Sequence, residues 1–139
     1  MSAKAYHLTS LAGAPLRPVV TKSGEQLSLQ LDLSAAAGFN HLRVSFERIA
    51  PGARQAPPHR HSTREEGFLV LQGRGLAIVE GERVAVAPGD VVLFPPGTEA
   101  HHALVNDGPD DLDLFVFSAD AGGDETTYAA SSTGPKLAR

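Results

Sequence analysis

The stretch PPHRHSTREEGFLVLQG, residues 57–73, decides how the whole chain is interpreted. It places His59 and His61 one residue apart, follows them with the adjacent pair Glu65 and Glu66, and then becomes apolar up to a glycine. Side chains on a β-strand alternate between its two faces, so the two imidazoles would point the same way, about 7 Å apart along the backbone. At that spacing they can chelate one ion, and a carboxylate from a neighbouring strand could join them.

A charged surface loop is the competing interpretation of the same residues. Arg60 and Arg64 could pair with the glutamates in water, and for an isolated His-x-His pair such a loop is the commoner case. Here the pair is not isolated, because His101 and His102 follow a Pro-Pro-Gly turn and four of the six histidines lie at these two places. The clustering favours a metal site.

The rest of the chain has the pattern of short strands separated by turns. Ten prolines and fourteen glycines punctuate the sequence, and the segments between them are brief, apolar and often alternating, which predicts an all-β domain. The first half of 27–38 also alternates, and although its alanines could form one helical turn, we interpret the segment as a strand. The other predicted strands lie within 41–50, 67–73, 76–81, 83–89, 91–97, 101–106 and 111–119.

Length, charge and composition exclude several classes of function. A chain of 139 residues suits a single domain. The net charge of -4 disfavours nucleic acid and anionic membranes as partners. No cysteine is present, so any metal must bind to nitrogen and oxygen ligands. The sequence has no apolar stretch of signal-peptide or membrane-span length, which predicts a cytoplasmic protein.

A cluster of three imidazoles and one carboxylate at an apolar barrel mouth would be a typical site for a divalent metal ion. The ligand chemistry suits Fe(II), Mn(II), Ni(II) or Zn(II). Coordination positions left open to water or substrate would let such an ion act as a Lewis acid, activate water or bind dioxygen. Strand alternation alone does not choose between Glu65 and Glu66 as the carboxylate, because both faces of the following strand are largely apolar.

The sequence resembles the cupin family in two ordered motifs. The first motif is a glycine, a short spacer, His-x-His, three or four residues, a glutamate, six residues and a glycine. The matching residues are Gly52, His59, His61, Glu66 and Gly73, with six residues after Gly52 where five are usual. The resemblance therefore selects Glu66 as the carboxylate ligand and leaves Glu65 as the alternative.

The second cupin motif is a glycine, five residues, Pro-x-Gly, two residues, a histidine, three residues and an asparagine. In this chain it corresponds to Gly89, Pro95, Gly97, His102 and Asn106, and four residues separate Gly97 from His102 where two are usual. His102 has the family's spacing to Asn106, whereas His101 lies closer to the glycine. His102 is favoured as the third histidine ligand and His101 is the alternative.

The resemblance implies a small double-stranded β-helix barrel, jelly-roll-like in its architecture. It covers residues 40–118, with 1–39 as amino-terminal strands and loops packed on the barrel and 119–139 as a flexible tail or an arm that contacts a partner. It implies a divalent ion bound by His59, His61, Glu66 and His102 at the barrel mouth. Because cupins are often dimers, we also expect a homodimer.

The resemblance implies no single reaction. We expect a metal-dependent enzyme that acts on a small polar molecule by dioxygenase-like oxidation or by isomerase, lyase or decarboxylase chemistry. The alternatives are a non-catalytic module that binds or senses a sugar or another metabolite, and a structural subunit. Arg48 shares strand parity with Phe46, and if that face points inward, Arg48 could hold a substrate carboxylate with two hydrogen bonds. Phe68 and Phe94 are the other candidates for contact with the ligand.

Overall fold

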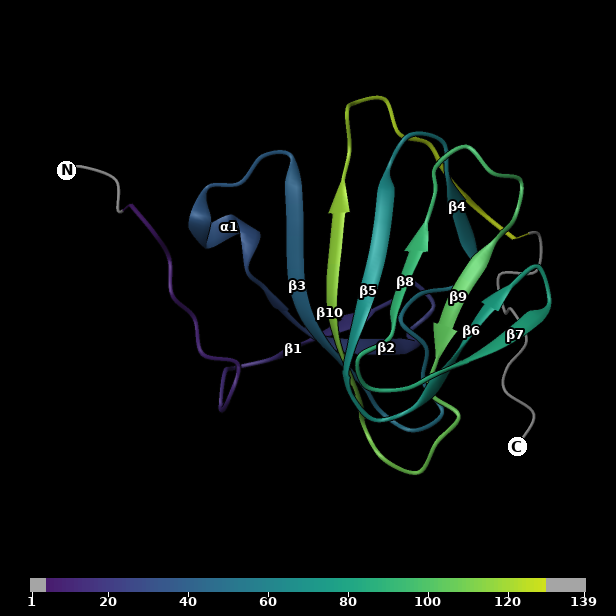
Figure 1. Ribbon diagram of the computed structural model, residues 1–139, viewed down its shortest axis with the longest axis horizontal. Coiled ribbons are helices and arrows are strands. Elements are labelled where there is room, and N and C mark those ends of the chain that lie inside the picture. Colours follow the sequence, from purple (N-terminus) through teal and green to yellow (C-terminus); the bar gives the residue numbers. More distant parts are fainter. Residues whose placement is uncertain (1–4, 130–139) are drawn as a thin grey trace.

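Two antiparallel β-sheets face each other across the interior of the protein (Figure 1). The computed structural model describes residues 5–129. The first sheet has the order β1 (Arg17–Val20), β2 (Gln26–Asp32), β3 (Leu42–Ile49), β10 (Leu112–Ala119), β5 (Glu65–Gln72) and β8 (Val91–Phe94). The second has the order β11 (Thr126–Tyr128), β4 (His59–His61), β9 (His102–Val105), β6 (Gly75–Val79) and β7 (Glu82–Val86). The predicted all-β barrel is confirmed.

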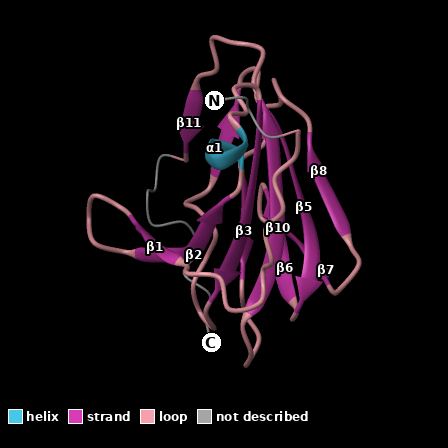
Figure 2. Ribbon diagram, turned by 90° about the vertical axis from the view of Figure 1, so that its left-hand side faces the viewer, coloured by secondary structure: helices cyan, strands magenta, loops and turns pink. Residues whose placement is uncertain are grey.

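The amino-terminal strands extend the first sheet. Residues Leu29 to Asp32 of β2 pair with β3, and β1 pairs with β2 to form a ribbon that projects at the side of the barrel (Figure 2). The segment 27–38 was predicted as a strand throughout, but only its first half belongs to β2. The alanines form the single helical turn α1 (Ser34–Ala37), which ends at Gly38 with a φ of 72°. Within residues 5–129, no helix has the length and apolarity needed to cross a membrane.

Cross-strand register defines which side chains face the barrel interior. Ile49 on β3 lies opposite Leu112 on β10, and both side chains are fully buried. Two residues along the same strands, Glu47 lies opposite Leu114, which in turn lies opposite Val70 on β5. The apolar core between the sheets consists of Ile49, Phe68, Val70, Ala77, Val86, Phe94, Leu104, Leu112, Leu114 and Val116.

The end of the first motif is fixed by a close approach of two backbone segments. Gly73 has a φ of 85°, and a Cβ atom at this position would lie 2.2 Å from the carbonyl oxygen of Asp111. Only glycine fits both the left-handed conformation and this contact. The last motif residue, Asn106, is fully buried, and its amide donates to the carbonyl oxygens of Ile49 and Asp110. These motif positions hold the loops at the end of the barrel.

The segment after residue 119 was expected to be a flexible tail or a partner-contacting arm. In the part that the structure describes, up to residue 129, it instead runs along the barrel of its own chain. Strand β11 pairs with β4, with Thr126 opposite His61 and Tyr128 opposite His59. Backbone pairing of this kind satisfies the edge of β4, which otherwise has only β9 as a neighbour. Residues 130–139 of the predicted tail lie outside the described residues.

Candidate metal centre

Strands from both sheets bring three imidazoles around one carboxylate. His59 and His61 lie on β4, His102 lies on β9 opposite His59, and Glu66 lies near the start of β5 in the other sheet. Oxygen Oε2 of Glu66 lies 3.5 Å from Nε2 of His59, 3.0 Å from Nε2 of His61 and 3.3 Å from Nε2 of His102. Each of the four side chains is at most 10% exposed. The sheets therefore direct all four polar groups towards one point.

The donor set fits a divalent metal ion. Ligand atoms of His59, His61 and Glu66 lie within 4.8 Å of one another, so one ion could bind all three. Imidazole nitrogen and carboxylate oxygen together suit iron, manganese, nickel or zinc. His102 adds a third imidazole on the same carboxylate oxygen. The group could hold a metal.

The other ring nitrogen of each β4 histidine is held by an acceptor. Nδ1 of His59 lies 2.7 Å from the carbonyl oxygen of Pro57, and Nδ1 of His61 lies 2.9 Å from Oδ2 of Asp124. Carbonyl and carboxylate oxygens only accept, so Nδ1 carries the proton and donates it in both contacts. In the neutral imidazole, Nε2 then keeps the lone pair that a metal needs.

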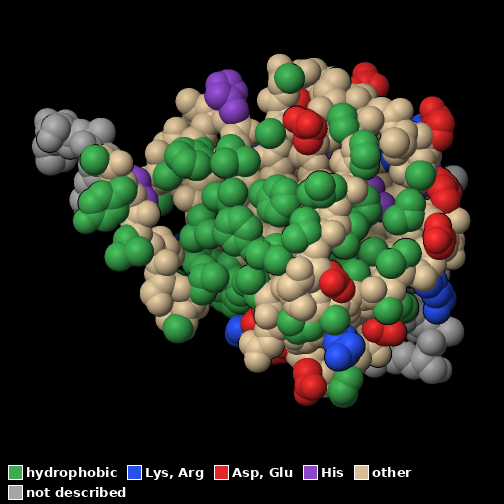
Figure 3. All heavy atoms as spheres, in the orientation of Figure 1, with side chains coloured by type: hydrophobic (Ala, Val, Ile, Leu, Met, Phe, Trp, Pro, Cys, Tyr) green, Lys and Arg blue, Asp and Glu red, His purple; other side chains and the backbone are tan. Residues whose placement is uncertain are grey.

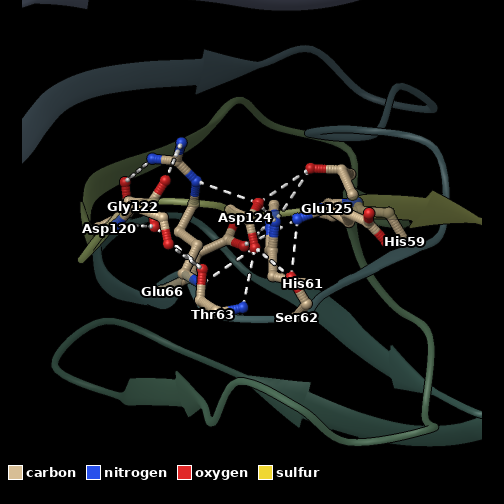
Figure 4. Close-up of polar contacts among 12 residues, drawn as sticks. His59, His61, Ser62, Thr63, Glu66, Asp120, Gly122, Asp124 and Glu125 are labelled. Atoms are coloured by element: carbon tan, nitrogen blue, oxygen red, sulfur yellow. Dashed lines mark hydrogen bonds and ion pairs between the residues drawn. The ribbon is translucent and has the colours of Figure 1, made fainter.

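Asp124 is the centre of a hydrogen-bond network beside the cluster (Figure 4). Besides His61, its carboxylate accepts hydrogen bonds of 3.0 Å from the backbone N–H groups of Thr63 and Arg64. Although burial favours the neutral form, these donors outweigh it and hold the pKa of Asp124 well below 3.8. Sequence reasoning missed Asp124, because it lies in a Gly- and Ala-rich segment without a motif. The only available signal was that a metal-binding histidine usually has such an acceptor.

Burial and hydrogen bonds inside the cluster shift the pKa values of three of its members. Burial opposes ionisation of Glu66, but hydrogen bonds from the three imidazoles outweigh burial and hold its pKa far below 4.5. Burial lowers the pKa of His102, so its neutral form is favoured. The pKa of His61 is raised above 6.5, chiefly by its hydrogen bond to Glu66. When the pH is below the raised pKa of His61, a metal ion would therefore have to displace a proton from this imidazole.

The structure separates the alternative residues in each adjacent pair. His102 is buried and stacks on Phe94, with ring centroids 3.8 Å apart, and its Nε2 atom faces Glu66. Nδ1 of His101 instead lies 3.2 Å from Oε1 of Glu80, outside the cluster. Glu65 is exposed. It precedes Glu66 on β5, so its side chain lies on the opposite face of the strand.

A cavity of about 240 Å³ opens beside the cluster and includes two of its residues. This volume lies just below the roughly 300–1,000 Å³ of typical ligand pockets, so the cavity suits a small molecule. Its walls are mostly polar and carry both signs of charge. It is lined by Gln30, Asp32, Arg43, Val44, Ser45, Glu47, Gln55, His61, Arg64, Glu66, Val116 and Ser118.

The residues predicted for substrate contact lie elsewhere. Arg48 is on the outer face of β3, because the inward residues of this strand are Glu47 and Ile49. Its guanidinium donates two hydrogen bonds, of 2.8 and 3.0 Å, to Asp113 on β10. Phe68 is 1% exposed within the core, and Phe94 packs between Phe68 and the ring of His102. The structure does not bring these three side chains to the polar cavity.

The fold is a small β-barrel with a buried histidine–carboxylate cluster that could hold a metal ion, and comparison with known proteins gives its family. Residues 45–118 match the family model described as "Cupin domain". The chain belongs to the cupin family. It has no significant match among curated proteins.

Solved structures resemble the chain over most of its length. A protein of Acidithiobacillus ferrooxidans, assigned provisionally as a sugar phosphate isomerase, is 28% identical with a TM-score of 0.79, covering 88% of this chain and 80% of that one. A sugar phosphate isomerase of the cupin superfamily from Silicibacter pomeroyi is 24% identical with a TM-score of 0.70, covering 74% and 66%. A predicted oxalate decarboxylase of Thermotoga maritima is 20% identical with a TM-score of 0.70, covering 82% and 99%. The last two likenesses support the fold alone.

Proposed function

We propose that this cupin is a metal-dependent isomerase of a small polyhydroxylated carbonyl compound that carries an anionic group, such as a sugar phosphate. The main observation in support is the polar cavity, which shares His61 and Glu66 with the histidine–carboxylate cluster. Amide, hydroxyl and carboxylate groups line it, and such groups suit a ligand with many hydroxyl groups. The assignment of the Acidithiobacillus ferrooxidans protein, at 28% identity, supports the same substrate class.

Arg64 is the residue best suited to bind the anionic group. Its guanidinium lines the cavity, and its side chain is 24% exposed. Its contacts with Ser118, Asp120 and Asp124 are 3.4 Å, 3.7 Å and 3.7 Å long. These are long for charge-assisted hydrogen bonds, which are usually about 2.7–2.9 Å. By turning towards a phosphate or carboxylate of the substrate, the guanidinium can therefore form hydrogen bonds that are shorter than its present contacts.

In this proposal His59, His61, Glu66 and His102 hold a divalent ion, which supplies Lewis-acid polarisation of the substrate carbonyl when bound. The identity of the ion, whether Fe, Mn, Ni or Zn, follows from the cell's metal supply as much as from the ligands. Asp124 and the carbonyl of Pro57 orient the β4 imidazoles. The cavity walls orient the substrate beside them.

Metal analysis and an isomerase assay together test this function. Protein loaded anaerobically with each ion is expected to bind one ion per chain, and His61→Ala is expected to lose it. Interconversion of aldose and ketose forms would then be followed by NMR for glyceraldehyde phosphate, ribose phosphate and glucose phosphate. Oxygen uptake or release of carbon dioxide in place of isomerisation would favour the dioxygenase-like or decarboxylase chemistry. Unchanged ligand affinity after removal of the metal, without turnover, would favour a binding or sensing protein.

We also propose that the protein is a homodimer, formed through the outer face of the first sheet. Figure 3 shows hydrophobic side chains gathered on this face. Val91 and Leu93 on β8 are 55% and 64% exposed, Leu42 at the start of β3 is 43% exposed, and Phe39 just before that strand is 50% exposed. Apolar side chains that gather on one exposed face are typical of a surface that contacts another protein chain.

A further inference from the structure

Glu47 occupies a position in the barrel where a carboxylate is unexpected. The residue is only 2% exposed, and its side chain lies on the inward face of β3. Its cross-strand neighbour on β10 is Leu114, which lies opposite Val70 on β5. Both neighbours belong to the apolar core. A carboxylate placed here loses hydration that only hydrogen bonds can replace, so its retention needs an explanation beyond packing.

Neutral side chains hold the Glu47 carboxylate in place. The hydroxyl of Ser28 donates to Oε1 over 2.8 Å, and the hydroxyl of Ser45 donates to Oε2 over 3.1 Å. The amide of Gln55 adds a longer contact of 3.3 Å to Oε1. Among the described residues, no Lys, Arg or His forms an ion pair with this carboxylate. Hydroxyl and amide donors, and not an ion pair, therefore fix the position of this carboxylate.

Glu47 also lines the cavity beside the metal cluster. Three carboxylates line this cavity, namely Asp32, Glu47 and Glu66. Glu66 is surrounded by the three imidazoles and would be occupied as a metal ligand. Asp32 is exposed and accepts hydrogen bonds from the backbone and hydroxyl of Ser34 at the start of α1. Glu47 alone is a buried carboxylate in the cavity wall outside the cluster.

We propose that Glu47 is the catalytic base and acid that moves a proton between two adjacent carbon atoms of the substrate; this inference rests on the proposed isomerase function. The C–H bond next to the substrate carbonyl breaks, its electron pair forms the carbon–carbon double bond of an enediolate, and the proton goes to a carboxylate oxygen of Glu47. Glu47 then returns that proton to the former carbonyl carbon. The hydroxyl proton moves to the other oxygen, so the isomer forms without an external oxidant or reductant.

Exchange of substrate hydrogen with deuterium oxide tests this role directly. Metal-loaded wild-type protein with glyceraldehyde phosphate, ribose phosphate or glucose phosphate is expected to exchange the hydrogen on the carbon next to the carbonyl, because Glu47 can trade its proton with solvent. Glu47→Gln keeps the size of the side chain and its contacts with Ser28 and Ser45. It is expected to slow exchange and isomerisation by about 100-fold or more, the usual range for loss of a general base.

Further measurements and variants separate a catalytic role from a structural one. Glu47→Gln is expected to keep the metal affinity, the far-ultraviolet circular dichroism spectrum and the melting temperature of the wild type, because Glu47 makes no contact with the cluster. Glu47→Asp, which retains a carboxylate, is expected to recover part of the exchange rate. Glu82→Gln, at an exposed position on β7, is the matched control and is expected to leave the exchange rate unchanged.

The outcomes distinguish this inference from the proposed function. Wild-type exchange that persists at the same rate in Glu47→Gln would overturn the role of Glu47 while leaving the isomerase intact. A metal-loaded wild type that exchanges and isomerises none of the three sugar phosphates would overturn the isomerase and, with it, the role of Glu47. If Glu47→Gln were to unfold, Glu47→Asp would decide the question. The inference would be overturned if Glu47→Asp bound as much metal as the wild type but showed no exchange above the uncatalysed rate.

Discussion

The two ends of the barrel interior differ in chemistry although the same three strands build both. At one end Arg43 on β3 lies opposite Ser118 on β10, which lies opposite Glu66 on β5. At the other end Ile49 lies opposite Leu112, and neither side chain is exposed. Glu47 stands between the two ends. Opposed side chains on this sheet are apolar at one end, where they stabilise the fold, and polar at the other end, where they form the site.

The division has an energetic meaning. The end that holds Ile49 and Leu112 is called the closed end below. Burial of its apolar side chains is the main favourable contribution to stability. The polar end contributes less, because the buried carboxylates and imidazoles lose hydration that their hydrogen bonds only replace. Substitutions at the two ends should therefore change different measured quantities. At the closed end they change the free energy of unfolding, and at the polar end they change metal affinity.

The largest effect on stability is expected at the closed end. Leu112→Ala removes most of a fully buried side chain from the core and should lower the free energy of unfolding by about 2–5 kcal/mol. Chemical denaturation followed by circular dichroism measures this loss. The metal stoichiometry of the folded variant should equal that of the wild type. A loss below about 1 kcal/mol would mean that the core closes around the missing side chain and that this end of the barrel does not dominate stability.

Asp124→Asn should weaken metal binding at the polar end roughly 10–100-fold, because the acceptor that orients His61 is lost. Competition titration with a chelator measures the affinity. Asp120→Asn is the matched control, because Asp120 contacts Thr63 and Arg64 and no metal-cluster histidine. Equal metal affinities for the two variants would show that Asp124 does not act through His61.

The lowered pKa of Asp124 gives the same variant a signature in the dependence of stability on pH. A carboxyl group whose pKa is lower in the folded protein contributes stability that is present above its ordinary pKa of 3.8 and is lost as the pH falls towards the folded value. Asp124→Asn lacks this group. Its free energy of unfolding should therefore decline less steeply than that of the wild type below pH 3.8, and a parallel decline would contradict the hydrogen-bond network around Asp124.

The sequence predicted the fold and the histidine–carboxylate cluster because both depend on local patterns. Alternation, turn residues and the two motifs were enough to predict the barrel, and the structure brings His59, His61, Glu66 and His102 together. Asp124 was not predictable in this way, because its contact with His61 joins residues 63 positions apart in the chain. No local pattern marks a partner at that distance.

The prediction of which side chains of β3 point inward was wrong for a different physical reason. The usual rule assigns the apolar face of a strand to the interior, which would turn Val44 and Phe46 inward together with Arg48. Here the outer face of the sheet is apolar as well, while the inner face carries Ser45 and Glu47 at the site. Both the functional site and the apolar outer face thus reverse the expected pattern. The consequence was that Arg48 was predicted as a substrate ligand and Glu47 was overlooked.

The apolar outer face extends the comparison to association between chains. Leu93→Glu places a charge on this face at the edge strand β8, where Leu93 packs beside Phe117 over Gly67. It should convert the proposed dimer into a monomer in sedimentation experiments, with a change of about 0.5 kcal/mol or less in the stability of the monomer. Val84→Glu on β7, where Val84 is 45% exposed, is the control in the other sheet. A wild-type protein that sediments as a monomer would remove the proposed interface.

The smallest effect is expected for His101, although it is adjacent to His102 in the sequence. Its ring is paired with Glu80 outside the cluster, so His101→Ala should leave metal affinity within about twofold of the wild type, inside the usual range for a surface change. His102→Ala removes the ring that contacts both Glu66 and Phe94 and should reduce the affinity far more. Both variants are measured by the same chelator competition. If His101→Ala were the more damaging of the two, β9 would have to shift by one residue when metal binds, because alternate side chains of a strand face opposite sides.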